Sequence, residues 1–172
     1  IQDLYEYDMA SKDFLIEEIS AAFSIPEDEI YIHNGSAELI KSVFSIGLER
    51  GDKVLTSNPG WNYYESLAKE KFCEVFYYNV RKDDYTYYMD IEDLLKKAEK
   101  YHPKIIVITN PHNPTGCKID VKTVEIIVKE NPESLILLDE AYWGFSETNI
   151  DVRRLVETYS NIIISRTFSK YY

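Results

Sequence analysis

The sequence predicts an α/β fold with three layers, α/β/α, built around a mostly parallel sheet. Short aliphatic runs alternate with longer stretches of helical periodicity along the 172 residues. The later expected strands, at residues 104–109, 135–138 and 161–165, have continuously apolar centres instead of alternating apolar and polar residues. Such strands are buried on both faces, which is typical of parallel sheets covered by helices on each side. The length is that of a single domain.

The amino-terminal part begins this alternation. A helix is expected from Ser11, where apolar residues recur at helical spacing, and Pro26 ends it. Residues 28–34 are expected to hold a short strand, and the turn at 33–38 opens a helix that runs to Leu48. The next expected elements are a strand at 53–57, a helix at 62–71, a strand at 74–80 and a polar, irregular segment at 81–88.

The second half continues the pattern with clearer signals. Leu94, Leu95 and Ala98 mark the inward face of an amphipathic helix. Helices are expected at 91–101 and 121–129, with a loop and a helix ending at 158, and one of the three apolar strands follows each of these helices. The strands and helices therefore alternate as they do in βαβ units.

Composition argues against several classes of protein. The net charge of −11 is spread along the chain without a basic patch, so nucleic-acid binding is not expected. Cys73 and Cys117 are isolated, which favours a reducing, cytoplasmic location over a disulfide scaffold. His33, His102 and His112 lack the spacing of metal ligands, so no metal site is expected. No apolar run approaches the roughly 20 residues of a membrane helix.

Three strand ends each deliver a polar group. Carboxyl ends of parallel strands share one edge of the sheet, and ligands bind there. Asn113 lies in a loop stiffened by two Asn-Pro pairs, Asp139 follows four aliphatic residues, and Lys170 follows the last strand. A buried Asp139 needs a partner, for which a helix amide, an arginine or a cationic ring nitrogen would serve. A lysine here is ordinarily a solvated charge, but a partly desolvated one can attack a carbonyl.

Two further loops add an anion site and an aromatic surface. The turn at 33–38 leads from the expected strand into a helix, where free backbone amides suit a phosphate. An ordinary helix cap by Ser36 is the alternative. Trp61 follows another strand and offers a flat ring. A planar, phosphorylated pyridine aldehyde would use all of these groups at once.

These segments together resemble a known family. The chain is similar to the fold-type I, pyridoxal-phosphate-dependent aminotransferases of class I/II, and most closely to their histidinol-phosphate aminotransferase-like branch. The resemblance rests on Gly35-Ser36-Ala37-Glu38, Pro59-Gly60-Trp61, residues 110–116, Asp139-Glu140-Ala141-Tyr142 and Arg166-Thr167-Phe168-Ser169-Lys170. It implies a pyridoxal 5'-phosphate cofactor and the large domain of that family.

The resemblance also implies a role for each matching residue. Lys170 would hold the cofactor as a Schiff base and move the substrate proton. Asp139 would pair with the pyridine nitrogen and keep it protonated. Asn113 and Tyr142 would bind the phenolic oxygen, and Trp61 would stack on the ring. Lys170, Asp139 and Tyr142 are thus the expected catalytic residues.

The phosphate would be held by a second group of residues. By the resemblance these are the amides of Ser36 and Ala37 and the hydroxyls of Thr167 and Ser169. Tyr7 lies where the family supplies a phosphate contact to the neighbouring subunit.

The implied activity moves an amino group between an amino acid, or an amino-alcohol phosphate such as histidinol phosphate, and a 2-oxo acid. The full-length protein would be a homodimer. Two alternatives remain open: a pyridoxal-phosphate decarboxylase or lyase on the same scaffold, and a non-catalytic sensor domain that binds the cofactor.

The chain departs from the family after Lys170, two residues before its end. Family members continue into a phosphate-binding arginine, an antiparallel strand and a small domain. We therefore expect residues 1–172 to be a partial cofactor-binding domain without its carboxy-terminal small domain. Such a chain would bind the cofactor poorly, turn over little substrate and expose strand edges.

Overall fold

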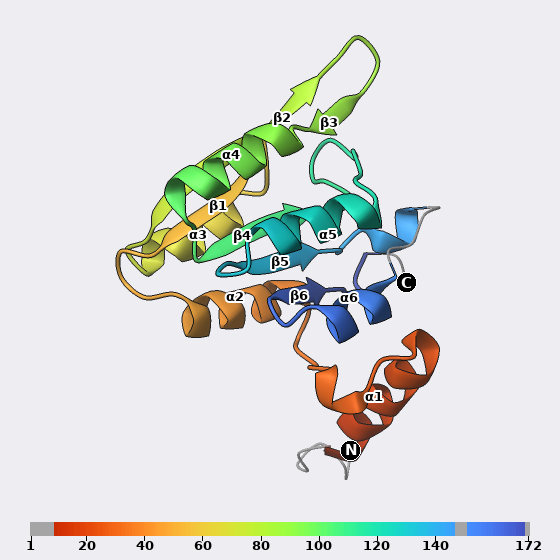
Figure 1. The fold of residues 1–172 in the computed structure, drawn as a ribbon. Helices are drawn as coiled ribbons and strands as arrows, with labels where there is room; N and C mark the ends of the chain where they lie inside the picture. The colour runs from red at the N-terminus through yellow and green to blue at the C-terminus, as the bar shows by residue number, and fades with distance from the viewer. Residues whose placement is uncertain (1–8, 147–150, 171–172) are drawn as a thin grey trace.

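The computed structural model describes residues 9–146 and 151–170, with side chains from residue 12 onward. Its centre is a six-stranded sheet in the order β3-β2-β1-β4-β5-β6 (Figure 1). The strands are β1 (Lys53–Asn58), β2 (Glu74–Lys82), β3 (Tyr87–Met89), β4 (Ile105–Thr109), β5 (Leu135–Asp139) and β6 (Ile162–Ser165). All neighbouring pairs are parallel except β2 with β3. The predicted mostly parallel α/β fold is confirmed.

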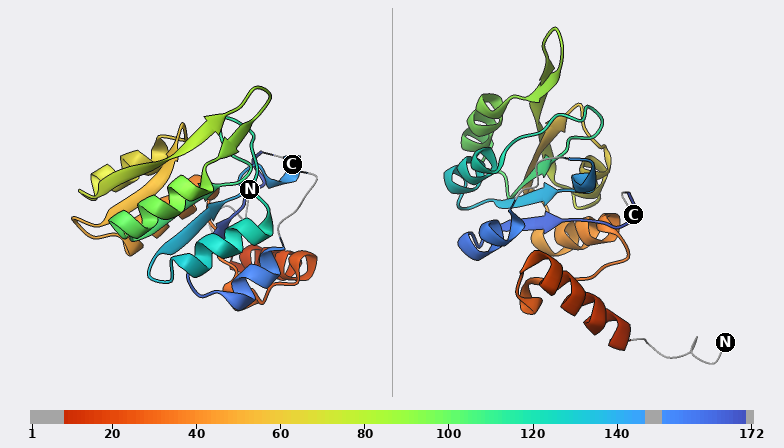
Figure 2. Two further views of the ribbon diagram at one scale, coloured as in Figure 1. Left: turned by 45° about the horizontal axis from the view of Figure 1, so that its top comes forward. Right: turned by 90° about the vertical axis from the view of Figure 1, so that its right-hand side faces the viewer.

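Helices cover both faces of the sheet. One layer holds α4 (Ile91–Tyr101), α5 (Val121–Glu130) and α6 (Val152–Thr158), and the other holds α2 (Ser36–Gly47) and α3 (Tyr63–Glu70). The right-hand view of Figure 2 shows the two layers on opposite sides of the strands. The first helix, α1 (Met9–Phe23), lies beyond the edge strand β6 (Figure 1), and short 3-10 turns span Glu27–Glu29 and Trp143–Phe145.

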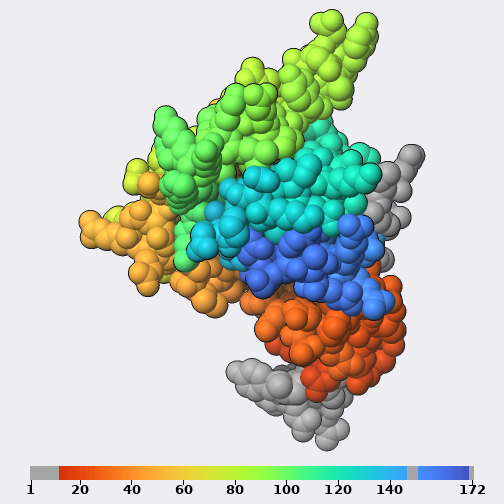
Figure 3. Space-filling model, in the orientation of Figure 1, coloured from red at the N-terminus to blue at the C-terminus, as the bar shows by residue number. Residues whose placement is uncertain are grey.

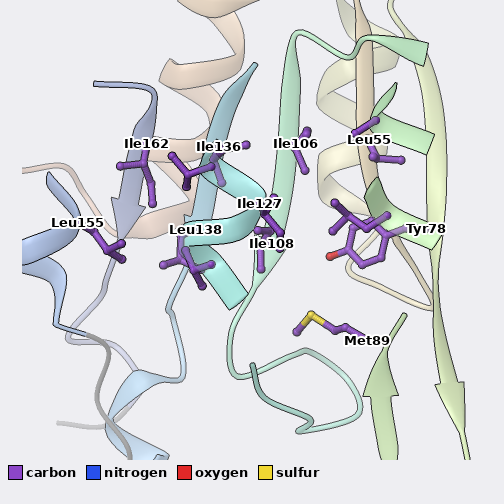
Figure 4. Close-up of a cluster of buried hydrophobic side chains, with 14 of the residues drawn as sticks. Leu55, Tyr78, Met89, Ile106, Ile108, Ile127, Ile136, Leu138, Leu155 and Ile162 are labelled. Atoms are coloured by element: carbon purple, nitrogen blue, oxygen red, sulfur yellow. The ribbon is translucent and has the colours of Figure 1, made fainter. Parts of the chain in front are cut away.

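Each layer buries its own cluster of aliphatic side chains. Ile106, Ile108, Ile136 and Leu138 point from the central strands toward α4, α5 and α6 and have no exposed surface (Figure 4). Their alternate neighbours pack against α2 and α3 on the other face. The strands are therefore apolar on both sides, and this explains their uninterrupted aliphatic sequence.

Three helices begin at an aspartate, because its carboxylate accepts a hydrogen bond from an otherwise unpaired amide of the first turn. Asp90 caps α4, Asp120 caps α5 and Asp151 caps α6, with oxygen–nitrogen distances of 3.0, 2.8 and 3.1 Å. These caps fix where each helix starts after its preceding strand or loop.

Two expected elements are wrong. Residues 28–34 do not form a strand. Residues 28 and 29 belong to the Glu27–Glu29 turn, the rest pair with no described strand, and Tyr31 is exposed. Residues 81–88 are not irregular, because β2 continues to Lys82 and β3 folds back on it. This hairpin projects from the body of the molecule (Figures 1 and 3). In the described part of the chain, no helix is both long and apolar enough to cross a bilayer.

Candidate active site

A row of polar side chains crosses the carboxyl edge of the sheet. Thr109, Asp139 and Ser165 are register partners on β4, β5 and β6. Partners in adjacent parallel strands point to the same face, so the three side chains form a row on the side covered by α2 and α3. All three are buried. The edge where the sequence places the chemistry is therefore polar within an otherwise apolar sheet.

Asp139 is the centre of this row, with only 2% of its surface exposed. The hydroxyl of Tyr64, from α3, donates to Asp139 Oδ2, and the Ala141 N–H donates to Oδ1 over 3.1 Å. Burial raises the pKa of the Asp139 carboxyl above its ordinary value, and the two donors oppose that rise. Among the residues that the structure describes, neither an arginine nor a helix amide capped by Asp139, two of the partners considered from the sequence, contacts this carboxylate. The donors are instead a tyrosine and the amide two residues on.

The neighbouring carboxylate, Glu140, takes the arginine instead. Arg166 Nη2 and Glu140 Oε2 lie 2.8 Å apart, and Arg166 Nε donates to the same oxygen. The guanidinium carbon also lies 4.5 Å from the ring centre of Trp143 and 5.0 Å from that of Phe23. Burial raises the pKa of Glu140, and Arg166 opposes this. The pair fixes the loop after β5 to β6 and to the end of α1.

Lys170 lies in a turn just past β6 and is exposed. Its Nζ is 5.6 Å from the ring centre of Tyr142. In the described chain the Lys170 side chain is thus solvated, which is the ordinary case for a lysine after a strand, and not partly desolvated. In the same turn, the hydroxyls of Thr167 and Ser169 lie 2.8 Å apart, and Ser169 N–H donates to Thr167 Oγ1 over 3.2 Å.

The loop at 110–116 is stiffly held. Its two X-Pro bonds, Asn110–Pro111 and Asn113–Pro114, are both cis. The Asn110 side chain both donates to and accepts from the backbone of Ile119, while Asn113 is half-buried at the turn. His112 is buried, with 2% of its surface exposed, and this burial lowers the pKa of its imidazole. Its Nε2 lies 3.0 Å from Ser57 Oγ. The histidine thus links this loop to the end of β1.

Trp61 lies on the loop after β1, next in the sheet to β4. Its ring is 4.8 Å from that of Tyr63 and meets that of Tyr64 edge-on at 5.3 Å. Gly60 is required before it, because a Cβ there would lie 2.5 Å from Ser57 Oγ. The stacking surface is therefore held against the same tyrosine that binds Asp139.

The helix α2 begins at the expected anion site. Gly35 has a φ of 85° and stands at the cap position without a side-chain cap bond, so the predicted alternative of a cap by Ser36 is wrong. Ser36 is the first helical residue and half-buried, and Ala37 is exposed. α2 contacts β6 and begins on the side to which the parallel strands run (Figure 1). Its first amides carry no side-chain partner from the cap.

The donor set fits pyridoxal phosphate. Within the described residues Asp139 has two neutral donors and no cationic partner, a place that a protonated ring nitrogen would fill. Ser165 Oγ is buried without a hydrogen-bond partner in the same row. The start of α2 supplies amides for an anion. The described residues hold no cluster of three metal-binding side chains. Tyr7 lies outside the described residues.

Sequence reasoning missed Tyr64 and its neighbour Thr109, whose Oγ1 is 3.2 Å from the Tyr64 hydroxyl. Their sequence separation hides the contact, although a tyrosine on the inward face of a predicted helix is a weak signal that could have found it. The Glu140–Arg166 pair was also missed, since each residue was noted only as part of a motif. A hollow of about 860 Å³ at the opposite edge of the sheet, lined by Asp52, Lys53 and His102 among others, contains none of the site residues.

Comparison with known proteins places this chain in an aminotransferase family. The family described as aminotransferase class I and II matches residues 6–172. Histidinol-phosphate aminotransferase 3 of Mesorhizobium japonicum is 35% identical over 158 residues, which are 92% of this chain and 41% of that protein. The histidinol-phosphate aminotransferase of Ruminiclostridium cellulolyticum is 34% identical, over 86% of this chain and 40% of its own length. The chain thus spans less than half the length of these curated relatives.

Solved structures share the fold. Histidinol-phosphate aminotransferase from Sinorhizobium meliloti, in complex with pyridoxal-5'-phosphate, superposes with a TM-score of 0.86 at 22% identity. The match covers 99% of this chain and 46% of that one. A pyridoxal-phosphate-bound C-S lyase from Staphylococcus hominis superposes with a TM-score of 0.78 at 21% identity, covering 92% of this chain and 42% of the lyase. The fold is therefore that of the large domain in such enzymes.

Proposed function

The chain belongs to the aminotransferase class I and II family, and from that premise we propose that it forms part of a pyridoxal-phosphate-dependent aminotransferase of the histidinol-phosphate aminotransferase type. Its substrates would be an amino acid or an amino-alcohol phosphate and a 2-oxo acid. The observation that carries the proposal is Asp139, a buried carboxylate held by two neutral donors at the ligand-binding edge of a parallel sheet. Burying a carboxylate in this way costs folding free energy unless a cation pairs with it.

Five residues of this chain would hold the ring. When bound, pyridoxal phosphate supplies a conjugated ring that accepts the electron pair left when the substrate loses its α-proton. Asp139 keeps the ring nitrogen protonated, and Asn113 and Tyr142 hydrogen-bond the phenolic oxygen. Trp61 covers one ring face, where the contact contributes about 1 kcal/mol. Lys170, an exposed amine beside the Tyr142 ring, takes and returns the substrate proton.

The phosphate would be bound where α2 begins. The amides of Ser36 and Ala37 stand at the positive end of the helix, which favours an anion. Thr167 and Ser169 already lie within hydrogen-bonding distance of each other, so both hydroxyls can serve one phosphate group. Tyr7 is proposed for the same role from a second subunit, so the working protein would be a dimer.

Sequence relatives favour transamination over the decarboxylase, lyase and sensor alternatives. The relatives described above that reach 34% identity or more are histidinol-phosphate aminotransferases. The likeness to the C-S lyase is of fold alone, at 21% identity.

The test is to locate the lysine that pyridoxal phosphate engages. The chain is incubated with excess cofactor, reduced with borohydride and digested, and the modified lysines are identified by peptide mass. We expect the visible absorbance band and the modified peptide to depend on Lys170, so that both are lost in Lys170→Ala. Lys96→Ala is the matched control, because Lys96 is an exposed lysine paired with Glu92 on α4. Equal modification of many surface lysines, unchanged in Lys170→Ala, would refute the proposal.

A further inference from the structure

Tyr64 is an unusual member of the apolar cluster beneath α2 and α3. It has no exposed surface, yet its hydroxyl lies at the polar row of the sheet edge and not among aliphatic side chains. It bridges Asp139 on β5 and Thr109 on β4, where the Thr109 Oγ1 distance is 3.2 Å. A phenol buried only for its hydrophobic area would not need two polar partners on neighbouring strands.

The direction of each hydrogen bond follows from the groups involved. An ionised carboxylate only accepts, so the Tyr64 proton lies toward Asp139 Oδ2. Thr109 then donates its own proton to the Tyr64 oxygen, giving a chain of two hydroxyls that ends on the carboxylate. Burial and the nearby Asp139 charge raise the pKa of Tyr64 well above its ordinary value, so the phenol stays protonated and remains a donor.

The acceptor capacity of Asp139 is only partly used. A carboxylate offers about four acceptor positions. Tyr64 occupies one on Oδ2 and the Ala141 amide occupies one on Oδ1. The two carboxylate oxygens are therefore held by two donors, one on α3 and one just after β5. Acceptor positions on the carboxylate remain for a further donor. A carboxylate held in this way cannot rotate without losing both bonds.

We propose that Tyr64, supported by Thr109, is a positioning residue that fixes the Asp139 carboxylate in its ionised form for the cationic ring nitrogen of the cofactor. The proposal rests on the proposed function for its last step only. The hydroxyl–carboxylate contact itself is a property of this chain. The Trp61 ring, which is the candidate stacking surface, also meets the Tyr64 ring edge-on at 5.3 Å, so one residue orients both the ring face and the ring nitrogen.

Tyr78 supplies a matched control. It is also fully buried in the sheet, and its hydroxyl donates to the Val107 carbonyl oxygen over 3.1 Å instead of to a carboxylate. Tyr64→Phe and Tyr78→Phe each remove one buried hydroxyl with little change of volume. A purely structural role for Tyr64 predicts similar effects from both substitutions. A positioning role predicts that only Tyr64→Phe changes the pKa of the Asp139 carboxyl.

The first readout needs no cofactor. Aspartate carboxyl carbons are labelled with ¹³C, and the Asp139 signal is assigned by its absence in Asp139→Asn and followed with pH. Tyr64→Phe is expected to raise the pKa of Asp139, because the lost donor stabilised the ionised form, whereas Tyr78→Phe leaves it where it was. Glu140 is the other carboxyl buried nearby and is separated from this signal by residue type.

The second readout uses pyridoxal phosphate labelled with ¹⁵N in the ring. The nitrogen signal of the protein-bound cofactor is expected to move from the protonated toward the unprotonated position in Tyr64→Phe, and the cofactor to dissociate about tenfold faster. If Tyr64→Phe fails to fold, Thr109→Val removes the supporting hydroxyl at nearly constant volume, with the same directions expected. An unchanged Asp139 titration in Tyr64→Phe, or an equal change in Tyr78→Phe, overturns the inference. If Asp139→Asn does not change the ¹⁵N signal of the cofactor ring, the proposed function is overturned. The effect of Tyr64→Phe on the pKa of Asp139 then stands as a separate result.

Discussion

Removing the arginine of the buried ion pair should destabilise the fold strongly and in a pH-dependent way. Arg166→Met keeps a long apolar stem but leaves Glu140, whose side chain is 2% exposed, without its cation. Breaking a buried pair by removing one partner costs about 3–5 kcal/mol, because the remaining charge stays desolvated. Loss of the guanidinium from the faces of Trp143 and Phe23 adds about 0.5–2 kcal/mol.

The pH dependence follows from the pKa of Glu140. Burial raises it and Arg166 lowers it, so the substitution raises it further. A carboxyl whose pKa is higher in the folded than in the unfolded chain stabilises the fold fully below the unfolded pKa, and this contribution is lost as pH rises through the folded pKa. The stability deficit of Arg166→Met should therefore be smallest in acid and grow toward neutral pH.

Urea unfolding at about pH 5 and about pH 8 measures this deficit directly. Arg153→Met is the matched control, because Arg153 pairs with Glu157 at the same 2.8 Å but with both side chains about half exposed. We expect no resolvable change from it. The double variant Arg166→Met/Glu140→Gln should recover much of the loss, since no buried charge remains. A loss under about 1 kcal/mol at both pH values, or one unaffected by the second substitution, would refute the reasoning.

Substitutions at Gly60 and Asn161, each with a comparison variant, test how the loops are held, and the urea midpoint of unfolding measures each effect. Gly60→Ala places a Cβ 2.5 Å from Ser57 Oγ and 2.7 Å from its carbonyl oxygen, so we expect a loss of about 1–3 kcal/mol. Gly47→Ala, with its nearest contact at 3.6 Å, should be neutral or stabilising, and equal effects would contradict the steric argument. The Asn161 amide donates to three carbonyl oxygens around the end of α5, so Asn161→Ala should cost about 1–3 kcal/mol. Asn161→Asp should cost more, and the reverse order would contradict the donor assignment.

The strands in the interior of the fold could be predicted from the sequence, because strands buried on both faces consist mostly of aliphatic residues. β4 and β5 lie within one residue of the expected strands, since every position before their last residue, Thr109 or Asp139, faces an apolar layer. The β2–β3 hairpin was missed for the opposite reason. Its residues are mostly exposed, and its turn is stabilised by Asp83, which accepts from the amides of Tyr85 and Thr86. Backbone pairing of this kind leaves little trace in hydrophobic pattern.

The short strand expected around Ile30 is not formed. β-branched residues favour an extended backbone, but a strand also needs a neighbouring strand to pair with. No described strand lies alongside it, so the propensity has nothing to pair with. At the site, parallel topology alone could bring the ends of β4, β5 and β6 to one edge, as expected. The partner of Asp139 could not be predicted, because Tyr64 lies 75 residues earlier on a helix whose rotation is set by packing.

The order of the elements along the chain also sets the order in which the proposed site residues emerge during synthesis. β4, β5 and β6 lie in the sheet in the order in which they are synthesised, whereas β2, β3 and α4 are synthesised between β1 and its neighbour β4. At about 5–20 residues per second, roughly 5 to 20 s separate the emergence of Trp61 from that of Lys170. The amine of Lys170 thus emerges last, after the aromatic ring of Trp61 and the carboxylate of Asp139 that are proposed to hold the cofactor ring.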